Sequence, residues 1–444
     1  MKFRGLLVAA IVLAALTGTL YWSNHRKPPE ITATASADIP PKILTLNQTD
    51  ITGVEIRKKT GEDIILGKTE AGQWQMTAPK SLPADQDAVL SMLSSLSSLN
   101  SDRLVDDKAT NLDQYGLVPP SIEVDIAKKD KTTVKLLIGD NTPAGSATYA
   151  AVTGDPRVFT LATYNKSNFD KSSNDLRDRR LLNFDSDKLS RVELSAKKQT
   201  MEFGRNKDQW QIVKPKPLRA DGFQVDDLVR SLHDAKMELS ATDDDKKTAA
   251  AFNSGSAIAT VKVTDVSGAQ ELQVRKNKDG YYAKSSVTAG VYKITNSTAT
   301  ALDKTLDDFR NKKLFDFGYA DPDKVEIHEG AKNVVVTRSG ADWLSNGAKM
   351  DAPSVTTLIG AVRDLSASKF PDNGFTSPAI EITVTSNDGK RIEKALLSKN
   401  GDAYVAKRDN EPALYEIAAS SVTELQNAAA SLKPAEVKPA PAKK

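Results

Sequence analysis

One segment of this chain occurs three times, and its spacing constrains the fold more than any other feature. Each copy contains a tryptophan, and the three tryptophans are 136 and 133 positions apart. A loop leads from each tryptophan to an aspartate, which stands four residues before apolar positions at i, i+3, i+4 and i+7, the pattern of one helix face. The copies are Trp74 with Asp85 and Val89, Met92, Leu93, Leu96; Trp210 with Asp221 and Val225, Leu228, Val229, Leu232; and Trp343 with Asp351 and Val355, Leu358, Ile359, Val362.

Further landmarks recur at a constant offset between the first two copies. Tyr149 and Phe159 are matched by Tyr282 and Tyr292, each 133 positions later. The segment 175–184 is matched in the same way by the segment 308–317. So many landmarks at one offset indicate duplication of a complete unit.

The remaining sequence of each unit predicts short antiparallel strands. Apolar residues alternate with polar ones in runs that end at Gly-containing turns, which is typical of β-hairpins. A second helix is predicted after the last strands, over about 166–180 in the first unit. We therefore expect an α+β protein of three tandem repeats, each an antiparallel sheet plus two helices, behind an N-terminal transmembrane helix. The expected divisions are 1–27 (tip and anchor), 28–43 (linker), 44–184, 185–318 and 319–432 (repeats one to three, the third diverged) and 433–444 (a disordered Pro/Ala/Lys tail).

The recurring tryptophans and aspartates have two interpretations each. An indole could stack on a sugar or another ligand, but recurrence at one position of every unit favours packing of Trp74, Trp210 and Trp343 between sheet and helix. Asp85, Asp221 and Asp351 could be catalytic carboxylates, but their distance from the helical pattern favours helix N-caps.

The N-terminus predicts location. Lys2 and Arg4 precede an uncharged run from Leu6 to Trp22, just long enough to span a bilayer. A cleaved signal peptide is the alternative, but its best cleavage motif, Ala35-Ser36-Ala37, lies far beyond the apolar run. We expect an uncleaved anchor at residues 6–22 in the inner membrane of a cell, with the bulk of the chain in the periplasm.

Composition excludes several classes of function. The chain has 61 basic and 58 acidic residues mixed along its length, which argues against a nucleic-acid binder. It has no cysteine, and its three histidines are far apart in the sequence, so no metal, cofactor or catalytic relay is predicted. The acidic runs 243–245 and 185–187 lack the glycine and glutamate of a calcium loop. We expect no enzyme activity, no cofactor and no nucleic acid.

A cluster of basic residues is the remaining candidate interaction site. Arg177, Arg179 and Arg180 are predicted at a helix end between units one and two, and Arg310 repeats the pattern before unit three. In a structural role these cations would favour the helix C-terminus and pair with Asp175 and Asp178. In a functional role they would hold an anionic ligand or the acidic surface of a partner.

The first unit resembles a known bacterial family. The residues that carry the resemblance are Gln73-Trp74-Gln75, Ala78-Pro79, Pro83-Ala84-Asp85, Tyr115-Gly116-Leu117-x-Pro119-Pro120, Leu137-Ile138-Gly139-Asp140, Tyr149 and Asp175-Leu176-Arg177-Asp178-x-Arg180-Leu181-Leu182. In this order they resemble the domains of unknown function numbered 4340, which are single-span envelope proteins often encoded beside ABC-type transporters. The resemblance implies an accessory envelope role and no catalytic residues.

Three functions follow as hypotheses. The first is a non-catalytic periplasmic scaffold or accessory subunit of an ABC-type transport system, since a repeated fold without a repeated reactive site offers surface. The second is a ligand-binding module that takes a glycan or lipid in clefts between units, which tryptophan or arginine gathered at such a cleft would favour. The third is a hydrolase, which would need a pocket that gathers two carboxylates, or a serine beside a lysine.

Overall fold

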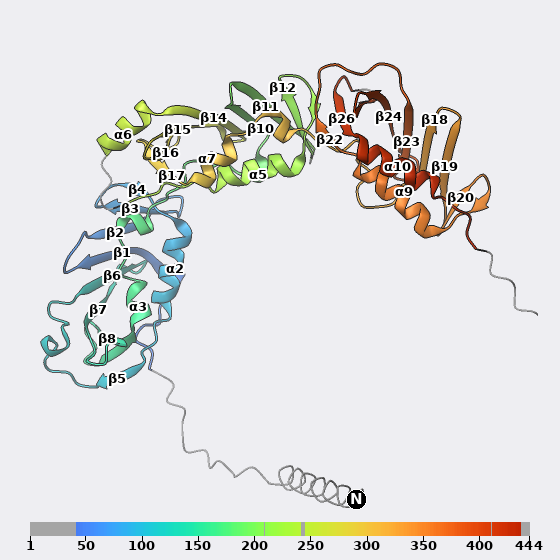
Figure 1. Cartoon of the computed structure of the whole chain (residues 1–444). Helices are drawn as coiled ribbons and strands as arrows, with labels where there is room; N and C mark the ends of the chain where they lie inside the picture. Colours follow the sequence, from blue (N-terminus) through green and yellow to red (C-terminus); the bar gives the residue numbers. More distant parts are fainter. Residues whose placement is uncertain (1–40, 208, 241–244, 410, 437–444) are drawn as a thin grey trace, which may run out of the picture. The chain divides into compact units, whose positions relative to one another are not determined.

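The computed structural model describes residues 41–207, 209–240, 245–409 and 411–436 (Figure 1). The anchor predicted at residues 6–22, most of the predicted linker and the last eight residues of the predicted tail lie outside these ranges. Among the described residues, no helix combines the length and the apolar character that crossing a bilayer requires.

Three antiparallel sheets, of nine, eight and nine strands in the described residues, form the body of the protein. All three share one topology. Four strands form a meander that ends in a two-residue edge strand, and a long helix then carries the chain to the opposite edge of the sheet. The chain then returns to the middle of the sheet, where a second four-stranded meander begins with its first strand paired to the first strand of the sheet, β1 with β6, β10 with β14 and β18 with β23, and runs outward to the opposite edge.

The strands follow the alternating patterns of the sequence. In repeat one they are β1 Ile51–Lys58, β2 Ile64–Lys68, β3 Trp74–Ala78, β4 Leu82–Pro83, β5 Arg103–Asp106, β6 Ile122–Lys128, β7 Thr133–Asn141, β8 Ala147–Val152 and β9 Val158–Ala162. In repeat two they are β10 Arg191–Ala196, β11 Gln199–Asn206, β12 Gln209–Lys214, β13 Leu218–Arg219, β14 Ser256–Asp265, β15 Gly268–Asn277, β16 Gly280–Ser285 and β17 Tyr292–Ile294. In repeat three they are β18 Lys324–Glu329, β19 Lys332–Ser339, β20 Asp342–Ser345, β21 Ala348–Lys349, β22 Ala367–Lys369, β23 Ile380–Ser386, β24 Arg391–Asn400, β25 Ala403–Arg408 and β26 Leu414–Ala418.

The long helix that follows the first meander begins at the predicted aspartate in every repeat. The carboxylate of Asp85 accepts from two backbone N–H groups of the first turn, as does that of Asp221, and Asp351 accepts from one, so all three are N-caps. The helices are α2 Gln86–Ser97, α3 Thr163–Ser167 and α4 Ser173–Leu176 in repeat one, α5 Gly222–His233, α6 Asp245–Ser254, α7 Asn296–Leu302 and α8 Leu306–Phe309 in repeat two, and α9 Ala352–Asp364 and α10 Ala419–Ala430 in repeat three.

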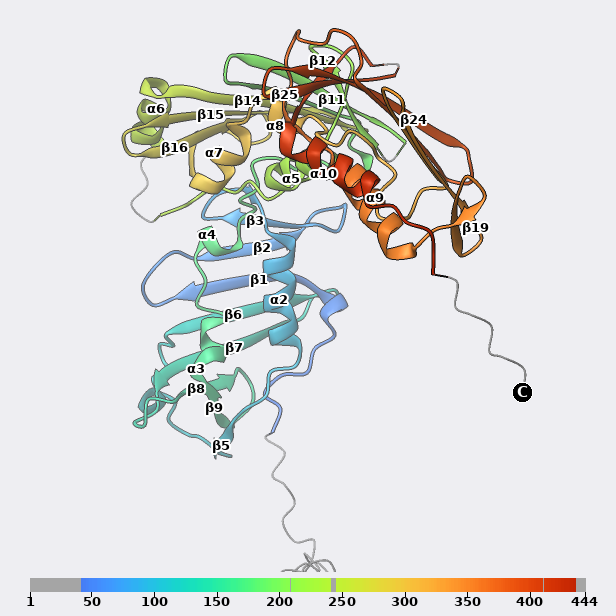
Figure 2. The ribbon, with the colours of Figure 1, turned by 45° about the vertical axis from the view of Figure 1, so that its right-hand side comes forward.

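Each repeat has its own hydrophobic core between its sheet and its long helix. Figure 2 shows α2 lying across the first sheet, and Figure 1 shows α9 and α10 together on one face of the third. Trp74, Trp210 and Trp343 lie in the three separate cores and are 3%, 6% and 7% exposed. The interpretation of the tryptophans as packing residues is confirmed.

Two pairs of backbone hydrogen bonds define where each repeat begins and ends. The first, the opening pairing, ties the start of a repeat to the segment after its long helix. Its bonds, of 2.8–3.1 Å, are Ile43 N to Leu99 O with Ser101 N to Pro41 O, Leu181 N to Ala235 O with Met237 N to Arg179 O, and Leu314 N to Leu365 O with Ala367 N to Lys312 O.

The second, the closing pairing, ties the end of a repeat to the edge strand before its long helix. Its bonds, of 2.8–3.0 Å, are Asp85 N to Leu176 O with Asp178 N to Pro83 O, Asp221 N to Phe309 O with Asn311 N to Arg219 O, and Asp351 N to Lys433 O with Ala435 N to Lys349 O. Each repeat is therefore a closed unit, and no residue separates one closing pairing from the next opening pairing.

The pairings place the ends of the repeats a few residues from the predicted divisions. They give repeats of 41–178, 179–311 and 312–435, whereas the sequence suggested 44–184, 185–318 and 319–432. Leu181, Leu182 and Phe184 pack in the core of repeat two. The chain also divides into compact units at Asp178, with repeats two and three together in the second unit, 179–444.

The second helix predicted over about 166–180 is wrong in its extent. Thr163–Ser167 and Ser173–Leu176 form two short helices, and the chain is extended from Arg177 onward. The helix stops because the closing pairing draws Leu176 and Asp178 onto the edge of the sheet. Tertiary pairing overrides the local helical pattern here.

Candidate functional site: the junction between repeats two and three

The predicted arginines Arg177, Arg179 and Arg180 lie in the extended strand that closes repeat one and opens repeat two. Arg177 forms a β-bridge with Ala84, and Arg180 forms one with Lys236. Arg177 is the C-cap residue of the short helix α4, as expected of a cation at a helix C-terminus, whereas Arg179 and Arg180 lie beyond the helix end. The backbone of each belongs to a pairing within its own unit, which accounts for the family motif at 175–182 as a structural element.

Arg310, the predicted equivalent of Arg177, is buried between repeats two and three. Its backbone bridges Ala220, the counterpart of Ala84, and its side chain is 10% exposed. The guanidinium carbon lies 3.5 Å from the ring centroid of Phe370, which packs against the core of repeat three. This cation–π contact joins the two repeats across their junction.

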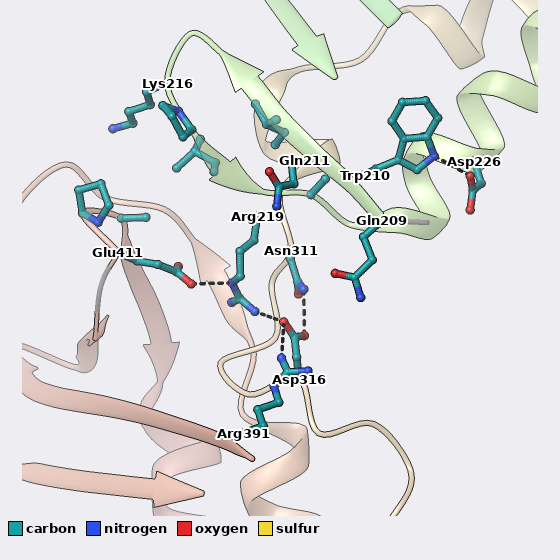
Figure 3. Close-up of a pocket in the computed structure, with 17 residues that line it drawn as sticks. Gln209, Trp210, Gln211, Lys216, Arg219, Asp226, Asn311, Asp316, Arg391 and Glu411 are labelled. Carbon is teal, nitrogen blue, oxygen red and sulfur yellow. Dashed lines mark hydrogen bonds and ion pairs between the residues drawn. The ribbon is translucent and has the colours of Figure 1, made fainter. Parts of the chain in front are cut away.

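Arg219 is the centre of a second contact across the same junction, which the sequence did not reveal. It ends β13 of repeat two, and its side chain reaches toward repeat three between two carboxylates (Figure 3). It forms an ion pair with Asp316 and donates to the carbonyl of Lys313. Its Nε lies 3.0 Å from an oxygen of Glu411, and it donates to the Tyr415 hydroxyl at 3.3 Å.

These contacts continue into a buried network within repeat three. Glu393 accepts from Arg408 at 2.8 Å and from Arg391 at 3.3 Å, and both of its oxygens accept from the backbone N–H of Asp316 at 3.1 Å. Arg408 also lies 3.1 Å from Glu411. The side chains of Glu393 and Arg408 are 4% and 9% exposed. Three arginines thus face three carboxylates, which leaves the network without net charge.

Burial and charge together set the ionisation of two of these groups. Burial alone would lower the pKa of Arg219, but Tyr415, Asp316 and Glu411 raise it, so the guanidinium stays charged. Burial raises the pKa of Tyr415, and its hydrogen bond to Glu411, at 2.7 Å, adds to that effect while the charge of Arg219 opposes it. The phenol therefore remains a neutral donor to Glu411.

A groove of about 760 Å³ opens beside Arg219 at the junction (Figure 3). Strand β12 forms one wall, the loop into β13 and the start of α5 form the next, and repeat three supplies the last. The lining residues are Gln209, Trp210, Gln211, Ile212, Lys216, Pro217, Leu218, Arg219, Ala220, Gly222, Asp226, Asn311, Asp316, Arg391, Glu411, Pro412 and Ala413.

The polar groups of the groove already have partners for the most part. Asp226 accepts from the Trp210 indole N–H at 2.8 Å, and Asn311 donates to Asp316 at 3.0 Å. Asp316 and Glu411 are both paired with Arg219. The lining includes no serine, cysteine or histidine. The described residues also contain no group of three or more metal-ligating side chains. The arrangement supports binding and rigid positioning.

Two further family motifs have a steric explanation in repeat one. Gly116 has a φ of 63°, and a Cβ built on it would lie 2.3 Å from the Asp140 carboxyl carbon. A Cβ on Gly139 would lie 2.3 Å from the Tyr115 carbonyl oxygen. The loop at 115–116 therefore packs against β7 at a distance that only glycine permits. These motif residues shape the fold.

Comparison with known proteins adds a family and no activity. No curated protein matches the chain, and neither does any solved structure. The family model described as Domain of unknown function (DUF4340) matches residues 74–211 and 210–380. Each match begins at the strand of a recurring tryptophan, and the first ends at the strand of the next, so the first match includes the whole closing pairing of repeat one and the first strands of repeat two. The chain belongs to the DUF4340 family, of which it contains two matched copies.

Proposed function

We propose that this protein is a membrane-anchored periplasmic scaffold, a non-catalytic accessory subunit of an envelope transport system of the ABC type. The observation that carries the proposal is the junction between repeats two and three. A neutral network of three arginines and three carboxylates, together with Arg310 on Phe370, holds two closed repeats in one compact unit. A rigid extended surface is what a scaffold requires.

The pairing of the groove's two carboxylates with Arg219 supports a non-catalytic role. A hydrolase would need two carboxylates free to exchange a proton or attack a substrate. Asp316 and Glu411 do meet in one groove, but Arg219 lies between them and neutralises both.

The inner-membrane location and the transporter partner rest on the sequence. The uncharged run 6–22 with Lys2 and Arg4 before it supports an anchor with an exported body. The family resemblance implies a single-span envelope protein encoded beside an ABC-type transporter, and this supports the choice of partner.

Purification of the tagged full-length chain from detergent-solubilised membranes tests this function. We expect the subunits of an ABC-type transporter to co-purify in a fixed ratio and to remain after a high-salt wash. Recovery of the chain alone, or of a mature N-terminus near Asp38, would contradict the proposal. A matched preparation of Arg219→Met should lose partner recovery if the rigid junction presents the surface.

A ligand-binding module for glycan or lipid remains the second candidate, because the groove lies between repeats and contains Trp210 and Arg219. The indole, however, is 6% exposed and turned toward Asp226 on α5 (Figure 3), so it offers little face for a sugar to stack on. Titration with maltotriose tests this candidate, and saturable quenching of Trp210 fluorescence would favour it over the scaffold.

A further inference from the structure

The edge of strand β12 at Trp210 differs from the equivalent edge in repeat one by a single missing side chain. In repeat one, the Trp74 backbone N–H donates to Gln86 Oε1 at 2.8 Å. The Gln86 amide in turn donates to the Trp74 carbonyl at 2.9 Å and to the Ala84 carbonyl at 2.8 Å. The side-chain amide thus pairs with the open edge of β3 as a neighbouring strand would.

Repeat two has Gly222 at the position of Gln86, directly after the N-cap aspartate in both repeats. The backbone of Trp210 faces the same side as that of Trp74, since Ile212 pairs with Leu218 as Met76 pairs with Leu82. Backbone direction alternates along a strand, so residues two apart face the same way. The N–H and C=O of Trp210 therefore point into the groove, where no Gln86 side chain meets them.

Repeat three satisfies this edge in another way. The Trp343 carbonyl accepts from the backbone N–H of Met350 at 2.8 Å. In repeat two the equivalent bond would run from the Ala220 N–H to the Trp210 carbonyl, and it is not present within the described residues. Repeat two also has no glutamine at position 222 whose amide could take its place. Repeat two thus combines a strand edge that neither of these bonds fills with a groove, and both Trp210 and Gly222 line that groove.

We propose that the groove binds an extended peptide segment of a partner protein, which adds to the edge of β12 at Trp210. One residue of the segment would accept from the Trp210 N–H through its C=O and donate to the Trp210 C=O through its own N–H, which are the two hydrogen bonds that the Gln86 side-chain amide makes with Trp74 in this same chain. Ile212, Pro217, Leu218, Pro412 and Ala413 supply apolar walls for the side chains on either side of that residue. Main-chain hydrogen bonds give such strand additions their affinity, and the walls their specificity.

This inference rests on the proposed function, because it supplies the site through which the scaffold holds its partner. It commits to peptide chemistry, since the internal occupant in repeat one is an amide. The hydroxyl groups of a saccharide can also donate and accept, but they do not have the fixed spacing of N–H and C=O along a β-strand, so binding of a saccharide in place of the peptide would contradict the proposal.

Full-length chain labelled with ¹⁵N-tryptophan in detergent micelles is titrated with the blocked peptide acetyl-(Ala)4-amide up to its solubility limit. We expect a saturable shift of the Trp210 backbone N–H signal and no shift of Trp74. In Gly222→Gln the response should be lost, because the new amide occupies the edge. The matched Gln86→Gly variant should make the Trp74 signal responsive.

The Gly222→Gln variant should fold, since a Cβ at this helical position meets nothing within 4 Å and glutamine is a better helix former than glycine. A second readout needs no ligand. Amide hydrogen exchange at Trp210 should slow by about 5- to 10-fold in Gly222→Gln, as expected for one added hydrogen bond.

Three outcomes would contradict the proposed peptide site. They are a Trp210 backbone signal that does not move with peptide, equal shifts of that signal in wild type and Gly222→Gln, or a shift of that signal when maltotriose replaces the peptide. Partner recovery separates the two proposals. If the chain binds the peptide but no transporter subunits co-purify, the peptide site is supported and the proposed function is contradicted. If Gly222→Gln recovers the transporter subunits in full, the partner does not bind through this site, and the proposed function is still supported.

Discussion

Arg205 lies directly opposite Trp210 on the neighbouring strand, with its guanidinium carbon 5.4 Å from the centre of the indole. The same cross-strand pair recurs as Lys68 with Trp74, where the ammonium lies 5.0 Å from the ring, and as Arg338 with Trp343. A basic residue therefore covers the ring of Trp74 and of Trp210, and a basic residue stands opposite Trp343 at the same register position. The pairs explain how a large indole remains at a sheet edge and is still almost fully buried.

Removal of a recurring tryptophan should unfold its repeat. Trp210→Ala empties a site that is 6% exposed in the core of repeat two, which predicts a loss of about 3–5 kcal/mol in the free energy of unfolding. Urea denaturation measures this loss, and the difference spectrum should show that the missing emission was blue-shifted. As a control, Phe223→Ala removes a side chain that is 84% exposed and should change stability by less than about 0.5 kcal/mol. Red-shifted emission with unchanged stability would contradict the packing role.

The N-cap aspartates should each contribute a modest amount. Asp85→Ala removes the acceptor for the N–H groups of Asp87 and Ala88, which predicts a loss of about 1 kcal/mol in thermal or urea unfolding. Asp85→Asn keeps an oxygen in place and should recover most of that loss. If both variants lost much more, the carboxylate charge itself would have a role that capping does not explain.

Arg219 should stabilise the second unit far more than an exposed arginine does. Arg219→Met leaves Asp316 and Glu411 without their shared cation in a mostly buried site, which predicts a loss of about 2–5 kcal/mol. Arg230 is the matched control, since its ion pair with Asp227 is on the surface of the same repeat. Arg230→Ala should cost no more than about 1 kcal/mol. Equal effects of the two variants in urea unfolding would show that the junction network adds no stability.

The junction should weaken in alkaline solution. The folded-state pKa of Tyr415 lies above the unfolded value of about 10, because the phenol is buried and donates to Glu411. A raised pKa contributes stability that is complete below pH 10 and is lost as pH rises through the folded value. Tyrosinate absorbance should show one late-titrating group in wild type that is missing in Tyr415→Phe. Titration of all tyrosines together near pH 10 would contradict the assignment.

Much of the repeated architecture could be predicted from the sequence because local patterns carry it. The spacing of Asp85, Asp221 and Asp351 to the apolar helix positions predicts caps and helices, and both the N-caps and the three antiparallel sheets are present. The short helices near Arg177 were mispredicted, because a strand pairing formed by residues far away in sequence decides their length.

The candidate site could not be predicted from the sequence. Arg219 meets Glu411 and Tyr415 across about 190 intervening residues of chain, and no local pattern marks such a contact. One signal was present in the alignment of the repeats, namely Gly222 at the position of Gln86. Its meaning depends on the hydrogen bonds of Gln86, which only the structure supplies.

Hydrogen exchange under increasing denaturant tests the central claim most directly, that the junction makes repeats two and three one rigid unit. Amides of β10–β12 and of β23–β25 should lose protection together in wild type, in one cooperative step. In Arg219→Met the same two groups should separate into two steps. Loss of protection at clearly different denaturant concentrations in wild type would contradict the claim, because the repeats would then unfold independently.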